Sequence, residues 1–131
     1  MILFLRAALF VGGLFYVILG VGFLLDPAGS GSDFGLAAQG PHGLATIRAD
    51  ITAFFVVAGG CMIWGGWARK GDPLLVTAAL MLLALLGRSV GLAMDGSYAG
   101  YWPPMVVEAV TVILALVASR MLPHTALEPD S

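Results

Sequence analysis

Charge is scarce in this sequence. Only 11% of the 131 residues are charged, whereas ordinary soluble domains carry about a quarter, and 60% are hydrophobic. A soluble core could not bury that much apolar surface. The six lysines and arginines form no basic run and the formal net charge is −2, so the sequence indicates neither nucleic acid nor an anionic membrane surface as a partner.

Cysteine and histidine are scarce as well. The single Cys61 has no second thiol with which to form an intrachain disulfide or share a metal, and we expect it to pack as a small apolar side chain. His42 and His124 fall on opposite sides of the membrane in the topology derived below. Catalytic motifs are missing too: there is no H-E-x-x-H, nucleophile elbow, Cys–His pair or phosphate-binding glycine loop. We therefore expect no enzyme activity, no catalytic residue, no metal and no cofactor.

Long apolar blocks are what the sequence does contain. They cover residues 2–25, 44–67, 74–94 and 103–122, and each has about 20 residues or more, the length a helix needs to cross ~30 Å of hydrocarbon. Because lipid offers no partners to backbone N–H and C=O groups, such runs must form helices. The sequence predicts an all-α fold, an integral membrane four-helix bundle in a single transmembrane domain. We expect an outer linker at 26–43 and a disordered tail at 123–131.

The first block shares some features with a secretory signal peptide. Arg6 precedes the apolar stretch, and the small residues Ala28, Gly29 and Ser30 follow it. That stretch runs about 19 residues after Arg6, beyond the ~7–15 residues of a typical signal core. We therefore expect the block to be a retained span.

Positive charge marks one side of the predicted bundle. Arg69 and Lys70 lie in the short linker between the second and third spans, and Arg6 and Arg120 lie on the same side. By the positive-inside rule that side is cytoplasmic, with both termini inside. The outer linker is rich in Gly, Ser and Ala, and we favour a flexible loop there. Its residues Phe34 and Leu36 leave the alternative that it lies on the membrane surface, as a lid over whatever is beneath it.

Small residues, which let membrane helices approach closely, occur in rows. The rows are Gly87 and Gly91 in the third span, Ala45, Ala49 and Ala53 in the second, and Gly12, Gly13 and Gly20 in the first. Gly87 and Gly91 form a G-x-x-x-G motif, which fits packing within one chain as well as dimerisation. We favour packing inside the bundle.

Three charged residues fall at membrane depth. From the helical rise, Arg48 and Glu108 lie ~6–8 Å below the outer ends of their spans, and Arg88 lies ~9 Å below the outer end of the third. A charge at the bilayer centre costs at least ~2.5–3.5 kcal/mol, so such residues usually face protein or water and find partners. We expect the three side chains to converge in one layer, where Glu108 bonds at least one arginine.

Helical spacing adds neighbours to this layer. Three pairs share a helix face: Arg88 with Asp95, Glu108 with Thr111, and Arg48 with Thr52. Tyr16 of the first span offers a hydroxyl at a deeper level, and Asp50 points away from Arg48. On the structural interpretation, which we favour, Glu108 pairs with one arginine and Asp95 or Asp50 with the other. On the functional interpretation, two arginines against one deep carboxylate leave positive potential for an anionic group, such as a lipid headgroup, a carboxylate or a phosphate.

Several short motifs resemble a known family. They are Ile47-Arg48-Ala49 at the start of a helix, Gly59-Gly60 later in it, the basic linker, Gly87-Arg88, an Asp95-Gly96 turn, and Glu108 early in the last span. Over nearly the whole chain they resemble the bacterial membrane proteins of domain of unknown function 4345 (DUF4345). The chain departs from that family's pattern at Ile51, Thr52 and Ala53, where the family has a tyrosine and paired glycines. The resemblance implies four spans in a bacterial inner (plasma) membrane and marks the two arginines and Glu108, and it supplies no activity.

Three functions are compatible with these features. We favour a non-catalytic binding or accessory membrane protein, whose ligand is anionic or amphipathic. Its expected site faces outward and is lined by Arg48, Arg88, Glu108, Asp95, Thr52, Thr111 and Tyr16. The alternatives are a structural subunit of a larger membrane complex and a small ion- or proton-coupled transporter. Expected partners are membrane lipids, an anionic small molecule or lipid headgroup, and either a second copy of the chain or a larger membrane complex.

Overall fold

A computed structural model describes residues 1–123, so all but the first residue of the predicted tail lies outside the described residues. Within the described part the chain forms helices and no strand. The elements in order are α1 (Ile2–Leu25), α2 (Pro27–Asp33), α3 (Gly40–Thr46), the π-helical segment η1 (Ile47–Ile51), α4 (Thr52–Ala68), α5 (Asp72–Asp95) and α6 (Trp102–Met121). Since α3, η1 and α4 follow one another without a break, four helices are long and apolar enough to cross a membrane. The predicted all-α architecture with four membrane-length helices is confirmed.

Proline and residues with positive φ set where the long helices begin and end. Pro73 lies in the first turn of α5, and Pro103 and Pro104 lie in the first turn of α6, where the missing N–H has no intrahelical partner to lose. Arg69 ends α4 in the left-handed conformation (φ 55°), and Gly96 ends α5 at φ 90°. The helices therefore end close to where the apolar blocks of the sequence end.

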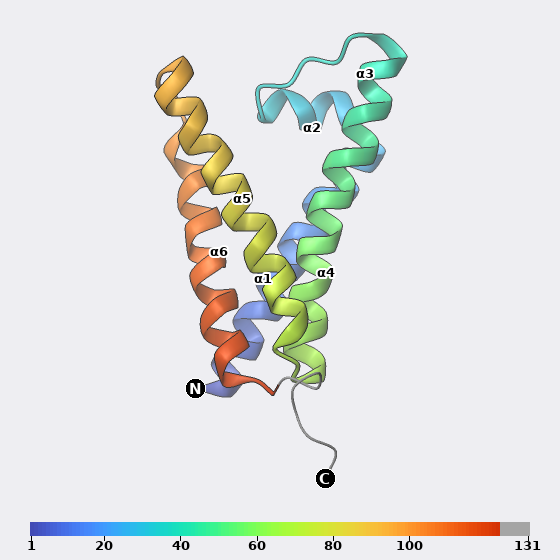
Figure 1. The fold of residues 1–131 in the computed structure, drawn as a ribbon. Coiled ribbons are helices and arrows are strands. Elements are labelled where there is room, and N and C mark those ends of the chain that lie inside the picture. Colours follow the sequence, from blue (N-terminus) through green and yellow to red (C-terminus); the bar gives the residue numbers. More distant parts are fainter. Residues whose placement is uncertain (124–131) are drawn as a thin grey trace.

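The antiparallel helices α1 and α4 form the most closely packed pair (Figure 1). A Cβ added at Gly13 would lie 2.6 Å from the carbonyl oxygen of Gly59, and one added at Gly20 would lie 2.9 Å from the Val56 side chain. Glycine is thus required for the two backbones to approach this closely. The prediction that the glycines of the first span pack inside the bundle is confirmed for these two.

The bundle is closed at the end where α1 begins and α6 ends, which we call the narrow end (Figure 1). There Leu9, Met62 and Leu74 are fully buried. Two buried hydroxyls tie the helices together: the Thr77 hydroxyl donates to the Ala58 carbonyl at 2.9 Å, and the Ser119 hydroxyl donates to the Gly71 carbonyl at 3.1 Å. Apolar packing and hydrogen bonds therefore join all four long helices at this end.

At the opposite, wide end, α5 and α6 lean away from α1 and α4 (Figure 1). The buried residues of α5 are Pro73, Leu74, Thr77, Ala78 and Met81, all in the half nearer the narrow end. A Cβ at Gly87 or Gly91 would meet no atom of residues 1–123 within 4 Å. The prediction that this G-x-x-x-G motif packs inside the bundle is therefore wrong, because the wide half of α5 diverges from the other pair and leaves both glycines on an open face.

The linker between the first two long helices is more ordered than the favoured prediction of a flexible loop. It contains α2, which begins at Pro27 and whose N-cap, Asp26, accepts a 3.0 Å hydrogen bond from the Gly29 backbone N–H. The helix lies across the wide end (Figure 1), and Phe34 follows directly after it. The abundance of glycine and serine concealed this short helix, because its capping geometry outweighs their low helix propensity.

Candidate functional site

The centre of the candidate site is an ion pair between α5 and α6. Arg88 Nε donates to Glu108 Oε1 at 2.7 Å, and the side chains are 30% and 10% exposed, respectively. Glu108 thus bonds an arginine, as the depth estimate predicted. Its other carboxylate oxygen, Oε2, is buried and has no hydrogen-bond partner among the described residues. The Tyr98 side chain also interacts with the guanidinium.

Arg48 does not join this pair, although the sequence placed it in the same layer. Its Nε donates to the Leu24 carbonyl at 2.9 Å, among the last four carbonyls of α1, which have no intrahelical partner. Arg6 acts in the same way at the other end of the pair, donating to the Gly66 and Trp67 carbonyls of α4 at 2.7 and 3.2 Å. Each arginine thus meets the negative end of the neighbouring helix dipole.

The π-helical segment η1 explains why the Arg48 side chain does not face Arg88. The prediction assumed an uninterrupted α-helix, in which Arg48 and Thr52 share a face. A π turn holds one additional residue, which rotates the side chains before it by roughly 100° relative to those after it. Because Arg48 lies inside Ile47–Ile51, it turns toward the end of α1 instead of toward Arg88.

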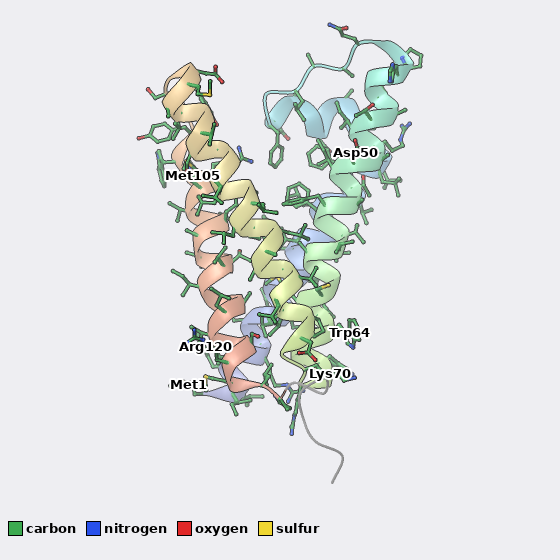
Figure 2. The ribbon with its side chains drawn as sticks, in the orientation of Figure 1. Met1, Asp50, Trp64, Lys70, Met105 and Arg120 are labelled. Atoms are coloured by element: carbon green, nitrogen blue, oxygen red, sulfur yellow. The ribbon has the colours of Figure 1, made fainter. Side chains whose placement is uncertain are left out.

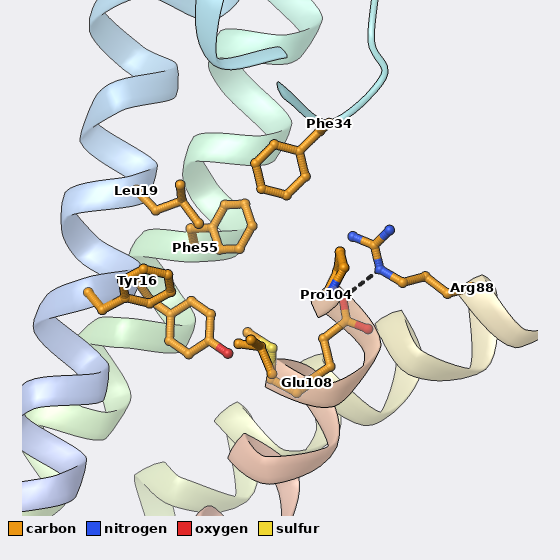
Figure 3. Close-up of a pocket in the computed structure, with 10 residues that line it drawn as sticks. Tyr16, Leu19, Phe34, Phe55, Arg88, Pro104 and Glu108 are labelled. Atoms are coloured by element: carbon orange, nitrogen blue, oxygen red, sulfur yellow. Dashed lines mark hydrogen bonds and ion pairs between the residues drawn. The ribbon is translucent and has the colours of Figure 1, made fainter. Parts of the chain in front are cut away.

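Two cavities adjoin the Arg88–Glu108 pair on the wide side of the bundle. The smaller one, of about 130 Å³, lies between α1, α5 and α6, and its lining includes Tyr16, Leu19 and Pro104 (Figure 3). The larger one, of about 350 Å³, lies between α4 and α5, beneath the segment that follows α2, and its lining includes Asp50, Phe54 and Ala84. Arg88, Glu108, Phe34 and Phe55 line both cavities. We call the two together the cleft.

Aromatic rings form the wall of the cleft opposite the ion pair. Tyr16 and Phe23 of α1 stack on Phe55 of α4, with ring centroids 5.9 and 5.8 Å apart. Phe34, from the segment after α2, reaches down to this wall and lies 5.2 Å from Phe23 and 6.0 Å from Phe55 (Figure 3). These contacts hold the α2 segment over the cleft, which is the lid arrangement given above as the alternative for this linker.

A hydrogen bond between α1 and α6 lies at the floor of the cleft. The Thr111 hydroxyl donates to the Val107 carbonyl at 2.8 Å, so its oxygen accepts from the Tyr16 hydroxyl at 2.7 Å. Met81 of α5 is fully buried beside them. Tyr16 therefore lines the cleft, and Thr111 supports it from behind.

The other two predicted site residues lie apart from the cleft. The Thr52 hydroxyl is buried without a hydrogen-bond partner in the described part of the chain, and Thr52 lines neither cavity. Asp95 lies exposed at the end of α5 and lines neither cavity either. The structure thus brings together Arg88, Glu108, Tyr16 and Thr111 and leaves Arg48, Thr52 and Asp95 outside.

Asp50 was predicted only as one of two possible partners of the second arginine, and the structure instead has Arg48 on the Leu24 carbonyl and Asp50 in the lining of the cleft. Asp50 lies in η1 and lines the larger cavity together with Arg88 and Glu108, and Figure 2 labels it toward the wide end. One signal pointed to it, because it is an acidic residue in an apolar span. Because Asp50 replaces Arg48, the cleft holds two carboxylates and one guanidinium, the reverse of the predicted excess of arginine.

The chemistry available in the cleft is recognition by charge, hydrogen bonds and aromatic contact. The guanidinium offers N–H donors, the carboxylates accept, and the aromatic rings provide an apolar surface. Within residues 1–123, no three His, Cys, Asp or Glu side chains lie close enough together to hold a metal ion.

The chain was compared with known proteins. Searches of curated proteins and of solved structures found no match. A family model described as "Domain of unknown function (DUF4345)" matches residues 4–119. That match covers the four long helices almost completely, together with α2 and the cleft, so the chain belongs to the DUF4345 family.

Proposed function

We propose that this membrane protein is a non-catalytic binding or accessory protein that holds the head of an amphipathic lipid in the cleft. The protein would lie as a multi-pass protein in the inner (plasma) membrane of a bacterium, with its narrow end in the cytoplasm. The positive-inside rule supports this orientation, since the narrow end carries Arg6, Arg69, Lys70 and Arg120 (Figure 2 labels the last two). The cleft would then open toward the outer leaflet.

One observation carries the proposal: an ion pair lies in an apolar, aromatic-lined cleft between helices of membrane length. An ion pair that served only to join α5 and α6 would need no cavities beside it. Here Arg88 and Glu108 line both cavities, and a buried carboxylate oxygen has no donor within the described residues. A few polar groups that converge in a mostly apolar pocket are typical of ligand sites.

The position of the cleft favours a lipid over a water-soluble ligand. The helices around it expose large apolar side chains, among them Leu83, Leu86 and Val90 of α5. The cavities, of about 130 and 350 Å³, are small for a whole lipid and suit its polar head and the first part of its chains. The remainder of the chains would stay in the bilayer, so the ligand could enter sideways.

Retention of lipid through purification tests the proposal. The test variant is Arg88→Gln with Glu108→Gln, which removes both charges but leaves two amides able to bond each other. The matched control is Arg48→Gln, which removes an arginine that lies outside the cleft. By native mass spectrometry in mild detergent, we expect the wild type and the control to retain lipid and the double variant to lose it. Equal retention by all three proteins would contradict the proposal.

A proton-coupled transporter is a second candidate, because Glu108 is a buried carboxylate at membrane depth with one oxygen unpartnered in the described structure. Proton flux into liposomes, abolished by Glu108→Gln and kept by Asp95→Asn, would support it. A lack of flux in the wild type would exclude it.

A structural subunit of a membrane complex is a third candidate, favoured by the open face at Gly87 and Gly91. Purification in mild detergent should then recover a stoichiometric partner or a second copy of the chain. A monomer with no partner would count against it.

A further inference from the structure

The balance of charge in the larger cavity carries information about the ligand. Arg88, Asp50 and Glu108 line it, which gives one positive group against two carboxylates. Two of these groups already form an ion pair, so the group without an opposite charge is Asp50. Among residues 1–123, no hydrogen bond or ion pair involves the Asp50 side chain. Asp50 is exposed, so water screens its charge, but a ligand that brought only negative charge would still be repelled by this carboxylate.

The buried oxygen of Glu108 sets a second requirement. Oε2 is buried and has no hydrogen-bond donor in the part of the chain that the structure describes, and the nearby Tyr16 hydroxyl already donates to Thr111. A buried acceptor without a donor is unfavourable, so occupancy by a group with N–H or O–H would be favoured. Because this oxygen is buried, a ligand group reaches it only if the Glu108 side chain shifts within the cleft.

The guanidinium of Arg88 sets a third requirement, which is for a negatively charged group on the ligand. Its Nε–H is used by Glu108, while its terminal nitrogens point away from Glu108, on the side of the cleft where Phe34 lies (Figure 3). These nitrogens carry more N–H donors than Tyr98 alone can satisfy. Guanidinium groups bind phosphate especially well. The ligand head therefore needs an anionic acceptor as well as a donor.

We propose that the lipid head is a phosphoethanolamine, in which a phosphate and a primary ammonium lie a short distance apart. This inference rests on the proposed function and deepens it. The phosphate accepts from the terminal nitrogens of Arg88. The ammonium donates toward Asp50 and toward Oε2 of Glu108, and the rings of Phe54 and Phe55 offer further attraction for a cation.

Other common headgroups satisfy fewer of these requirements. Phosphocholine carries the same charges, but its quaternary ammonium has no N–H to give to Glu108. Phosphoglycerol has hydroxyl donors, but it brings no cation to Asp50. The three heads thus separate the contribution of the N–H donors from the contribution of charge.

Competition between lipids on the wild-type protein gives the first test. Delipidated protein in detergent is mixed with equal amounts of phosphatidylethanolamine, phosphatidylcholine and phosphatidylglycerol with identical chains, and bound lipid is counted by native mass spectrometry. Since a hydrogen bond to a charged group is worth about a factor of ten or more in affinity, we expect about tenfold preference for phosphatidylethanolamine over phosphatidylcholine. Mono- and dimethylated phosphatidylethanolamine should fall between the two. Preference for phosphatidylglycerol, or no preference, would overturn the inference.

A pair of matched variants gives the second test. Asp50→Asn removes the unpaired carboxylate of the cleft, whereas Asp95→Asn makes the same change in charge at a residue that lines neither cavity, and both residues are exposed. We expect Asp50→Asn to lose most of the preference for phosphatidylethanolamine and Asp95→Asn to keep it. An unchanged preference in Asp50→Asn would overturn the inference. If lipid retention depends on the Arg88–Glu108 pair but not on the type of headgroup, the inference fails and the proposed function stands. If lipid retention does not depend on the pair, the proposed function fails.

Discussion

The two ends of this bundle are built from the same four long helices, yet one is closed and the other is open. Glycines bring α1 and α4 together along their length, and at the narrow end buried hydroxyls of Thr77 and Ser119 join α5 and α6 to the rest. At the wide end, α5 buries no side chain beyond Met81, and the space is bordered by aromatic rings and an ion pair. The difference shows that a small residue brings helices together only where another helix lies opposite, as at Gly13 but not at Gly87 or Gly91, and that aromatic and charged residues border the space where the helices diverge.

The arginines show the same contrast. Arg6 and Arg48 satisfy carbonyls at the ends of the paired helices α4 and α1, so each strengthens the closed α1–α4 pair. Arg88 instead pairs with a side chain at the edge of a cavity. A charge at membrane depth is therefore not by itself a sign of a ligand site; its partner and the space beside it decide between structure and binding.

The largest effect is expected from blocking the close approach of α1 and α4. Gly13→Leu would place a side chain against the Gly59 backbone, and we expect it to destabilise the protein by about 3 kcal/mol through overpacking. The control is Gly91→Leu, on the open face of α5, which should change stability little. Thermal unfolding in detergent would measure both. Equal losses in the two variants would show that the open face is packed after all.

A smaller loss is expected when the ion pair is broken on one side. Glu108→Ala leaves Arg88 without its carboxylate, and we expect a loss of about 2 kcal/mol, below the range for fully buried pairs because Arg88 is partly exposed. Replacing both residues by leucine should recover most of the loss, since no unpaired charge remains. Chemical or thermal unfolding of the single and double variants tests this. If the double variant were as unstable as Glu108→Ala, the Arg88–Glu108 ion pair would contribute to stability beyond the neutralisation of its two charges.

Removing the hydrogen bond at the cleft floor should have a modest effect. Tyr16→Phe deletes the hydroxyl that bonds Thr111, and we expect a loss of about 1 kcal/mol. Tyr101→Phe, on the exposed turn before α6, is the matched control and should be neutral. Unfolding midpoints compare the two. A neutral Tyr16→Phe would indicate that this bond does not hold α1 to α6.

The smallest effect, and of the opposite sign, is expected on the open face of α5. Gly87→Ala replaces a helix glycine that has no described atom within 4 Å of an added Cβ, so it should stabilise the protein by up to about 1 kcal/mol. Unfolding in detergent should be paired with the same measurement in liposomes. A loss of stability in liposomes alone would reveal a partner covering this face, as the structural-subunit alternative requires.

The sequence predicted the helices better than their mutual arrangement. Apolar blocks of about 20 residues are a local signal, so the four membrane-length helices and the meeting of Arg88 with Glu108 followed from the helical rise. The π turn at Ile47–Ile51 carries no such signal, and it moved Arg48 out of the predicted layer and left Asp50 in the cleft. The divergence of α5 and the docking of Phe34 depend on contacts between distant residues, which periodicity does not encode.

The most direct test of the central claim is photo-crosslinking of lipid inside the cleft. A photoreactive phenylalanine analogue replaces Phe54, which lines the larger cavity, or Phe4, which is exposed near the narrow end. After irradiation in bacterial lipids, we predict phospholipid adducts at both positions in the otherwise wild-type protein. Adding Arg88→Gln with Glu108→Gln should greatly reduce the adduct at position 54 and leave the adduct at position 4 unchanged. No lipid adduct at position 54, or an equal yield there with and without the ion pair, would contradict the account.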